Sequence, residues 1–422
     1  MKLQRALITL VAWGCLGWAA PAYADVVTHW NDITLRAVTA GRPGPVGFLD
    51  VALVQAAVHD AVQAFERRFE PYHASIEGAS GTPAAAAAAA AHGVLVGLYP
   101  AQQAALDADF VAYLTANGLA GDPGITVGEQ AAAALLTQYR GAPATPLPPY
   151  VGGNEPGTWR PTPSEIGNPP SPPPFSPMAT LYLAFTKPFT LNRPSQFRPS
   201  PAPPLASERY RRDYDEVKDY GAQFNSARTA EQTDLAYFWT DNVVTQWNRA
   251  LRAIADAHLT TPGDSARLLA LANLATADAL IACWDSKYHF SFWRPLTAIR
   301  EGDADGNAGT LGDPAWHSLI NTPPYPDYTS GANNVSGAMT AILEQFFGTD
   351  ALTFTIASNA PLAVQKTRTY TRLSDVAQEV VDARVLLGIH FRFADEEARR
   401  QGTRVATWAF RKFLRPVPGS GR

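Results

Sequence analysis

The sequence predicts an all-α protein, built as a helical bundle with one long irregular connection. Apolar residues recur at steps of three and four along most of the chain, as in Val51, Val54, Val58 and Val62, which is the spacing of one helix face. No alternating apolar–polar stretch of useful length occurs in the sequence, so no sheet is expected. The chain has 422 residues, 46% of them apolar, and can therefore bury a large core. Its net charge of −4 without basic runs argues against a nucleic-acid partner.

The predicted helices are bounded by residues that start or end helices. Pro100, Gly118 and Gly124 separate the early ones, while Ser207 and Asp264 are suitable N-caps for two later ones. In chain order, the predicted helices are Phe48–Phe65, Ala84–Leu98, Ala101–Leu114, Ile125–Tyr139, Ser207–Tyr220, Thr229–Trp239, Thr245–His258, Asp264 to about Trp293, Gly337–Phe347, Ser374–Leu387 and Glu396–Phe413.

Residues 143–206 interrupt the helical pattern. This stretch holds 19 of the chain's 35 prolines, so regular helix or central strand is not expected there. Several aromatic residues within it need burial, which favours an arm wrapped over the helices; a disordered linker is the alternative. These aromatic residues are Trp159, Phe175, Tyr182, Phe185, Phe189 and Phe197.

The first 24 residues have the composition of a secretory signal. Lys2 and Arg5 give a positive start, residues 6–20 are mostly apolar, and Ala22-Tyr23-Ala24 forms a small-x-small cleavage site before Asp25. The apolar run is shorter than the roughly 20 residues that a membrane span needs; a retained anchor is the alternative. We therefore expect export to a periplasm or out of the cell, without a membrane span after cleavage.

The mature chain, residues 25–422, is expected to form a single helical domain. Its one cysteine is Cys283, so it can form no internal disulfide, and packing must supply its stability. Cys283 precedes Trp284 in an apolar stretch and is expected to be buried and inert.

A first segment of the second half carries two cations suited to an anion. Lys287 and Arg294 lie seven residues apart, which is close to two helical turns, so both can point from one helix face. Pro295 disfavours helix at Arg294, whose guanidinium is therefore expected at a helix end. Aromatic neighbours place both cations in an apolar setting, where a bound anion would supply the missing charge. A solvated basic face is the alternative.

A second segment offers backbone amides. Ser330-Gly331 follows the rigid approach Pro323-Pro324-Tyr325-Pro326. Gly331 lets the backbone come close to a ligand, and the amides after it could open a helix N-terminus that attracts anions. An ordinary Ser-Gly turn is the alternative.

A third segment adds one more cation and an imidazole. Arg384 and His390 are six residues apart, which is not one helix face, but Gly388 between them would let a helix end and His390 turn back. The neighbours Ile389 and Phe391 keep a plain core histidine open as the alternative.

Two further groups of polar residues are weaker candidates. Asp303-Ala-Asp305-Gly-Asn307 starts like a calcium loop, but Pro314 stands where the glutamate of position twelve would be, so an Asx-rich turn is expected. His59 and Asp60 have no second ligand pair at metal spacing, so we expect them to be structural. The sequence contains no Ser-His-Asp elbow and no glycine-rich nucleotide loop.

Together, the three anion-binding segments resemble the signature of the vanadium-dependent haloperoxidases, whose superfamily includes the type-2 phosphatidic-acid phosphatases. That pattern is Lys, six residues, Arg-Pro; then Pro-Ser-Gly-His; then Arg, five residues, His. The first and third parts match in residue and spacing, and the middle part matches at Ser330 and Gly331. Other segments look like the bacterial secreted branch of the family, so that the resemblance covers nearly all of the mature chain: Asp25-Val-Val-Thr-His-Trp-Asn, Arg228-Thr-Ala-Glu-Gln-Thr, Phe238-Trp-Thr-Asp241, Ala282-Cys-Trp-Asp-Ser-Lys-Tyr-His and Gly388-Ile-His-Phe-Arg-Phe393.

The resemblance implies a helical bundle that holds vanadate as its cofactor. His390 would be the axial ligand of vanadium. The residues that would hold the vanadate oxygens are Lys287, Arg294, Ser330, Gly331 and Arg384. By the same resemblance, Asp241 would pair with Arg384 and orient it, while Trp284 and Tyr325 would line the halide pocket.

One position departs from the family pattern in a way that bears on activity. Ala332 stands where the family has histidine, and Thr329 replaces the proline. That histidine would serve as acid–base beside the anion, and such help is typically worth roughly 10²–10⁴-fold in rate. Asn333 and Asn334 follow, but neither exchanges a proton near neutral pH. We expect anion binding to persist and turnover to be reduced.

Three functions are consistent with these residues. The first is a haloperoxidase-like enzyme that uses hydrogen peroxide to oxidise halide and passes the product to a small organic acceptor. The second is a phosphomonoesterase that binds phosphate at the same residues, with His390 as nucleophile. These residues are called the cage below: Lys287, Arg294, Ser330, Gly331, Arg384 and His390. The third is an oxyanion-binding protein without turnover.

Overall fold

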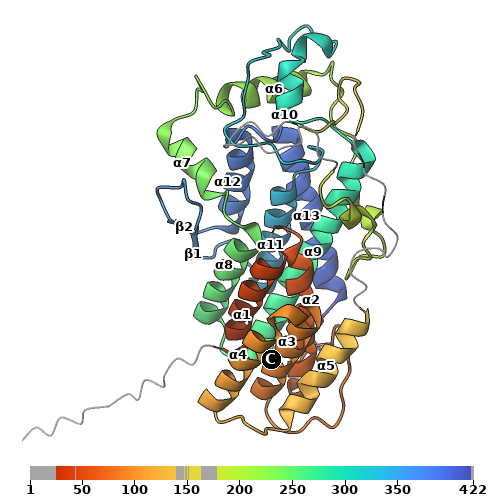
Figure 1. Ribbon diagram of the computed structural model, residues 1–422, viewed down its shortest axis with the longest axis vertical. Coiled ribbons are helices and arrows are strands. Elements are labelled where there is room, and N and C mark those ends of the chain that lie inside the picture. Colours follow the sequence, from red (N-terminus) through yellow and green to blue (C-terminus); the bar gives the residue numbers. More distant parts are fainter. Residues whose placement is uncertain are drawn as a thin grey trace, which may run out of the picture.

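The computed structural model describes residues 25–42, 44–138, 147, 150, 152–162 and 178–419 (Figure 1). Helices make up 60% of the chain, and one small sheet has two strands. The predicted all-α class is therefore confirmed. The predicted signal sequence, residues 1–24, lies outside the described residues.

The first five helices pack together at one end of the molecule (Figure 1). They are α1 (Val26–Gly41), α2 (Gly47–Glu66), α3 (Pro83–Leu98), α4 (Gln103–Ala116) and α5 (Gly124–Gln138). Helices α3 and α5 approach closely because small residues face each other: a Cβ atom added at Gly128 would lie 2.2 Å from the Ala86 carbonyl oxygen. Helix α1 was not predicted; it begins after Asp25, whose side chain accepts a hydrogen bond from the Val27 amide.

Helix α9, Pro262–Phe290, runs through the centre of the fold. It is buried on nearly all sides, as expected for a helix that is apolar all round, and it packs against α2, α11 (Gly331–Phe347) and α13 (Arg392–Lys412). Its N-cap is Thr261, whose hydroxyl accepts from the Asp264 amide. The prediction of Asp264 as the cap was therefore wrong by three residues.

The remaining α-helices and strands lie toward the other end of the molecule, except α8 (Val243–His258), which packs beside α1 (Figure 1). The others are α6 (Glu208–Tyr220), α7 (Ala230–Phe238), α10 (Pro295–Arg300), α12 (Leu373–Leu386) and the strands β1 (Phe354–Ala357) and β2 (Thr367–Tyr370). Ser207 caps α6 as predicted, since its hydroxyl accepts from the Tyr210 amide. The two antiparallel strands, with Phe354 opposite Tyr370, and the short helix α10 were not predicted.

The described part of the proline-rich segment packs on the helices, as an arm would. Asp278 of α9 accepts hydrogen bonds from the amides of Phe189, Thr190 and Leu191, and Trp159 is fully buried. One expectation was wrong, because the Phe185 side chain is 44% exposed. Phe175 lies outside the described residues.

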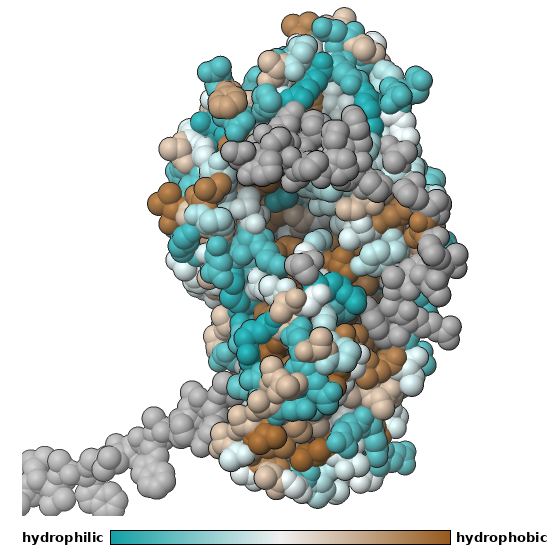
Figure 2. All heavy atoms as spheres, viewed as in Figure 1, coloured by the Kyte–Doolittle hydropathy of each residue, from teal (hydrophilic) through white to brown (hydrophobic). Residues whose placement is uncertain are grey.

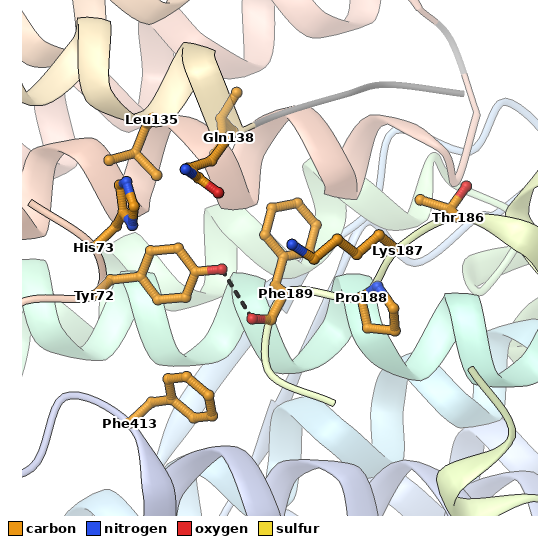
Figure 3. A pocket seen from close by; sticks show the side chains of 10 residues that line it. Tyr72, His73, Leu135, Gln138, Thr186, Lys187, Pro188, Phe189 and Phe413 are labelled. Carbon is orange, nitrogen blue, oxygen red and sulfur yellow. Dashed lines mark hydrogen bonds between the residues drawn. The ribbon is translucent and has the colours of Figure 1, made fainter. Parts of the chain in front are cut away.

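This arm also forms one wall of a cavity of 180 Å³ (Figure 3). Lys187, Pro188 and Phe189 face Tyr72, whose hydroxyl donates to the Phe189 carbonyl at 2.9 Å. None of the predicted anion-binding residues lines this cavity.

Two helices have the length and hydropathy of membrane spans, but both are covered. The most apolar windows of α2 and α9 are 94% and 100% buried within the structure, and the bent pair of α3 with the segment Pro100–Ala116 passes the same test of composition. Hydrophilic and hydrophobic residues are interspersed over the face shown in Figure 2, which is hollowed near its middle. The expected lack of a membrane span stays a prediction.

The weaker candidates of the sequence have structural contacts. His59 Nε2 lies 3.0 Å from the Glu70 carbonyl oxygen, and the Asp60 carboxylate accepts from the amides of three residues that follow Pro71. Asp305 accepts from the Asn307 amide and the Thr310 hydroxyl, which is the predicted Asx-rich turn. Cys283 is free and buried, as expected.

Candidate oxyanion site

Three chain segments bring the predicted anion-binding residues together near the end of α9. Helix α9 ends at Phe290, and Ser291 follows with a φ of +46°. The chain then runs extended to Arg294, which is the N-cap of α10. Lys287 and Arg294 therefore do not share one helix face, and that expectation was wrong. Pro295 begins α10, where its missing N–H costs nothing. The Arg294 guanidinium lies against the Tyr325 and Ile389 carbonyls.

Lys287 is fully buried and is held by backbone oxygens. Its Nζ donates to the carbonyls of Pro326 at 2.6 Å and Asp327 at 3.0 Å. The ammonium also lies 5.0 Å from the centre of the Tyr325 ring. Burial lowers the pKa of Lys287 to about 7, because desolvation disfavours the charged form.

Arg294 is fully buried beside His390. Its Nη1 donates to the Ile389 carbonyl at 2.6 Å and lies 3.2 Å from His390 Nε2, while its Nε donates to the Tyr325 carbonyl. Burial and the charges of Arg294 and Lys287 hold the pKa of His390 well below its usual range. His390 is therefore neutral near pH 7, and a neutral imidazole is the form that can bond a central atom.

The turn between α12 and α13 places His390 as the sequence predicted. Helix α12 ends at Leu386, and Gly388 has a φ of +74°, a conformation that glycine adopts without strain. A Cβ atom at Gly388 would also lie 2.4 Å from the Gly221 carbonyl oxygen. Both the turn and the close packing therefore require glycine at this position.

Ser330 and Gly331 stand at the N-terminus of α11, which starts six residues before its predicted start. Ser330 is fully buried, and its amide donates to the Ala394 carbonyl, while its side chain makes no capping bond. The free amides of this first turn carry the partial positive charge of a helix N-terminus. They offer an anion the environment that the sequence predicted.

Arg384 belongs to the same cluster, but not through the partner expected for it. Its Nη1 donates to the Trp239 carbonyl at 3.2 Å. Asp241 instead pairs with Arg249 and accepts from the Asn359 amide. The prediction that Asp241 pairs with Arg384 was therefore wrong, although both residues line one cavity.

That cavity has a volume of 240 Å³ and lies against the N-terminus of α11. Trp284, Tyr325, Ala332 and Arg384 line it, together with Gly331. The Trp284 and Tyr325 rings lie 5.1 Å apart between their centres. The two aromatic residues that the resemblance assigned to a halide pocket therefore face this cavity, and so does the position that lacks histidine.

Two buried carboxylates in the cluster were not among the predicted site residues. Asp327 Oδ1 lies 2.7 Å from His390 Nδ1 and 3.5 Å from Arg294 Nη1. Burial raises the pKa of Asp327 to about 7, while Arg294 and Lys287 oppose that shift. Asp395 Oδ1 accepts from Asn333 at 2.7 Å, and burial raises its pKa well above the usual range. An acidic residue within the second segment was the signal that could have pointed to Asp327.

The polar atoms left without partners show what the site fits. Among the described residues, the buried donors Arg294 Nη2 and Arg384 Nε make no hydrogen bond, and such groups are normally satisfied. Guanidinium donors suit the oxygens of vanadate or phosphate. Within the described part of the chain, no cluster of three or more His, Cys, Asp or Glu side chains could hold a bare metal ion.

Comparison with known proteins finds similarity over part of the chain. Residues 267–419 match the model of the second helical-bundle domain of vanadium chloroperoxidase. A stretch of 94 residues is 38% identical to the vanadium chloroperoxidase of Curvularia inaequalis. In these stretches the chain is similar to the vanadium chloroperoxidases. The alignment with the fungal relative spans 20% of this chain and 15% of that protein.

Solved structures of haloperoxidases share the fold over most of the chain. The first bacterial vanadium-dependent iodoperoxidase superposes with a TM-score of 0.76 at 22% identity, covering 92% of this chain and 97% of that one. An apo-type bacterial vanadium-dependent chloroperoxidase gives a TM-score of 0.71 at 21% identity, over 88% and 94%. The holo-type gives 0.70 at 22% identity, over 88% and 93%. The helical architecture is thus that of the haloperoxidases.

Proposed function

We propose that this protein is a vanadate-dependent haloperoxidase-like enzyme that oxidises halide with hydrogen peroxide, with turnover reduced by the alanine at position 332. The observation that carries the proposal is the cluster of three cations around a neutral His390, with unpartnered guanidinium donors. The match of residues 267–419 to a domain of vanadium chloroperoxidase and the fold shared with haloperoxidases support the same proposal.

The residues of the cage have distinct parts in holding vanadate. Lys287, Arg294 and Arg384 would offset its negative charge, and the first amides of α11 would bind its oxygens. His390 is neutral and can give a lone pair to the central atom. When bound, vanadate supplies Lewis-acid activation of peroxide toward a halide ion.

The cavity beside the cage suits the halide, which is the substrate to be oxidised. Trp284 and Tyr325 supply aromatic walls, and Arg384 supplies a positive charge at the same wall. A halide in this cavity would meet the cation of Arg384, although Asp241 lines the same cavity and is paired with Arg249. The methyl group of Ala332 cannot accept or give a proton, so protons from peroxide must leave by another route, which slows turnover.

Bromination of a phenol-type dye tests the proposal. The purified mature chain is assayed with bromide and peroxide, with and without orthovanadate, and with excess phosphate as competitor. Activity that needs vanadate and is suppressed by phosphate supports the proposal. Vanadate binding without bromination overturns it, and hydrolysis of p-nitrophenyl phosphate by the same preparation would then favour a phosphomonoesterase.

We further propose that the protein is exported. The signal-like composition of residues 1–24 supports this proposal. Cell fractionation of a producing strain tests it, since a full-length product retained in the cytoplasm would contradict it.

A further inference from the structure

The cavity of 240 Å³ beside the cage carries more aromatic surface than a halide ion needs. Trp239 and Trp247 line it in addition to Trp284 and Tyr325. The rings of Trp239 and Trp247 lie 6.0 Å apart between their centres, at an interplanar angle of 37°. Two separate parts of the chain therefore present aromatic side chains to one cavity.

Hydrogen bonds hold two of these rings in place. The indole N–H of Trp239 donates to the Glu379 carboxylate at 2.9 Å, and that of Trp284 donates to the Ala179 carbonyl at 3.1 Å. Glu379 is itself held by the Tyr370 hydroxyl, which donates to it at 2.6 Å. Because the walls are already ordered, a ligand that binds between them pays little conformational entropy.

The volume of the cavity fits a single aromatic ring. An apolar cavity of about 150 Å³ is large enough to bind benzene, and this one has 240 Å³. A halide ion is comparable in size to one or two water molecules of roughly 30 Å³ each, so it would leave most of the space unfilled. Ala332 lines the cavity where the family pattern has histidine, and its small side chain enlarges the space available to a ring.

One edge of the cavity is polar. Thr240, Asp241 and Asn242 line it at the start of α8. The Asp241 carboxylate accepts from the Arg249 guanidinium and from the amides of Asn242 and Asn359. A carboxylate accepts at about four lone-pair positions, so Asp241 can accept one hydroxyl more. A ring that carries a hydroxyl group therefore matches both the aromatic walls and this edge.

We propose that this cavity is the binding site of the organic acceptor and that the acceptor is a phenol, halogenated while it is bound beside the cage. The chemical step rests on the proposed function, whereas binding of the phenol does not. Gly331 and Arg384 of the cage line the same cavity, so the bound ring lies next to the groups that would hold vanadate oxygens.

The halogenation balances without a further reagent. Hydrogen peroxide and one proton convert the halide to hypohalous acid and water. An electron pair of the electron-rich ring then forms the carbon–halogen bond as the oxygen–halogen bond breaks, and the hydroxide that leaves takes the ring proton as water. One phenol, one halide, one hydrogen peroxide and one proton thus give one halophenol and two waters.

Calorimetry on the purified mature chain tests the binding site, with phenol and cyclohexanol as probes of similar size. Each aromatic contact strengthens binding by about two- to tenfold, so we expect phenol to bind at least about fivefold more tightly than cyclohexanol. Equal affinity for the two alcohols, or no binding of phenol, would overturn the proposal.

Val243→Trp locates the bound phenol, because Val243 is a half-buried residue of the cavity wall outside the cage. The larger side chain fills the cavity, and we expect phenol affinity to fall at least about tenfold. Val111→Trp is the matched control, since Val111 is 61% exposed on α4, and it should bind phenol as the wild type does. Circular dichroism and phosphate titration establish that each variant is folded and keeps its cage.

A second variant serves where Val243→Trp does not fold. Trp239→Leu removes one aromatic wall and should weaken phenol binding by about two- to tenfold. Unchanged phenol affinity in either folded variant would show that phenol binds elsewhere and would overturn the proposal.

The products of phenol bromination test whether the ring reacts while bound. A ring held in one orientation should give an ortho-to-para ratio at least about twofold different from that of free hypobromous acid. An identical ratio would mean that the oxidised halide leaves the protein before it reacts, which overturns the assignment. Selective phenol binding without bromination by the vanadate-loaded protein would reject the haloperoxidase function and leave the phenol site standing.

Discussion

Replacing Ala332 by histidine should raise bromide oxidation, because the alanine removes an acid–base group from an otherwise complete cage. Ala332 lines a cavity of 240 Å³, several times the roughly 30 Å³ that one water occupies in the liquid, so an imidazole ring fits without moving the backbone. General acid–base help of about 10²–10⁴-fold corresponds to about 3–5 kcal/mol of activation free energy. We therefore expect kcat to rise by at least about 10²-fold in Ala332→His.

The assay is dye bromination under saturating orthovanadate, with vanadate affinity measured in parallel. Ala332→Gln is the matched control, because its side chain fills similar space but cannot exchange a proton; it should stay at the wild-type rate. Should Ala332→His bind vanadate as tightly as the wild type and oxidise bromide no faster, the missing acid–base group would not be what limits turnover.

Three other predictions concern the cage and the mature N-terminus. Anion affinity should fall as the pH rises above 7, because the pKa of Lys287 is lowered to about 7 and its ammonium then loses the charge that binds the anion. Calorimetric titration of the wild type and of Lys287→Arg measures this fall. The fall should be weaker in Lys287→Arg. Arg384→Met should weaken vanadate binding by about 10- to 100-fold through loss of a charged hydrogen bond, while Arg249→Met, which removes the partner of Asp241, should not; equal losses in both would contradict the site. Mass spectrometry of the exported protein should give a chain that begins at Asp25, and an uncleaved mass would show that prediction to be wrong.

Local patterns were enough for most helices and for the three anion-binding segments. Helix α2 was expected at 48–65 and lies at Gly47–Glu66. The prediction was possible because the three- and four-residue spacing of apolar residues can be read from one contiguous stretch of sequence. The elements that escaped prediction have little such pattern. Helix α10 has six residues, and each strand has four, so too few positions exist to show a period.

The sequence alone determined the helical class and the residue types that can grip an oxyanion, since these follow from local periodicity and from the chemistry of Lys287, Arg294, Arg384 and His390. Only the tertiary structure decided which partner each of them meets. Asp241 pairs with Arg249 and not with Arg384, and a buried carboxylate joins the cage from the segment before Ser330. Such choices depend on how elements far apart in the chain pack against one another, and no local spacing encodes them.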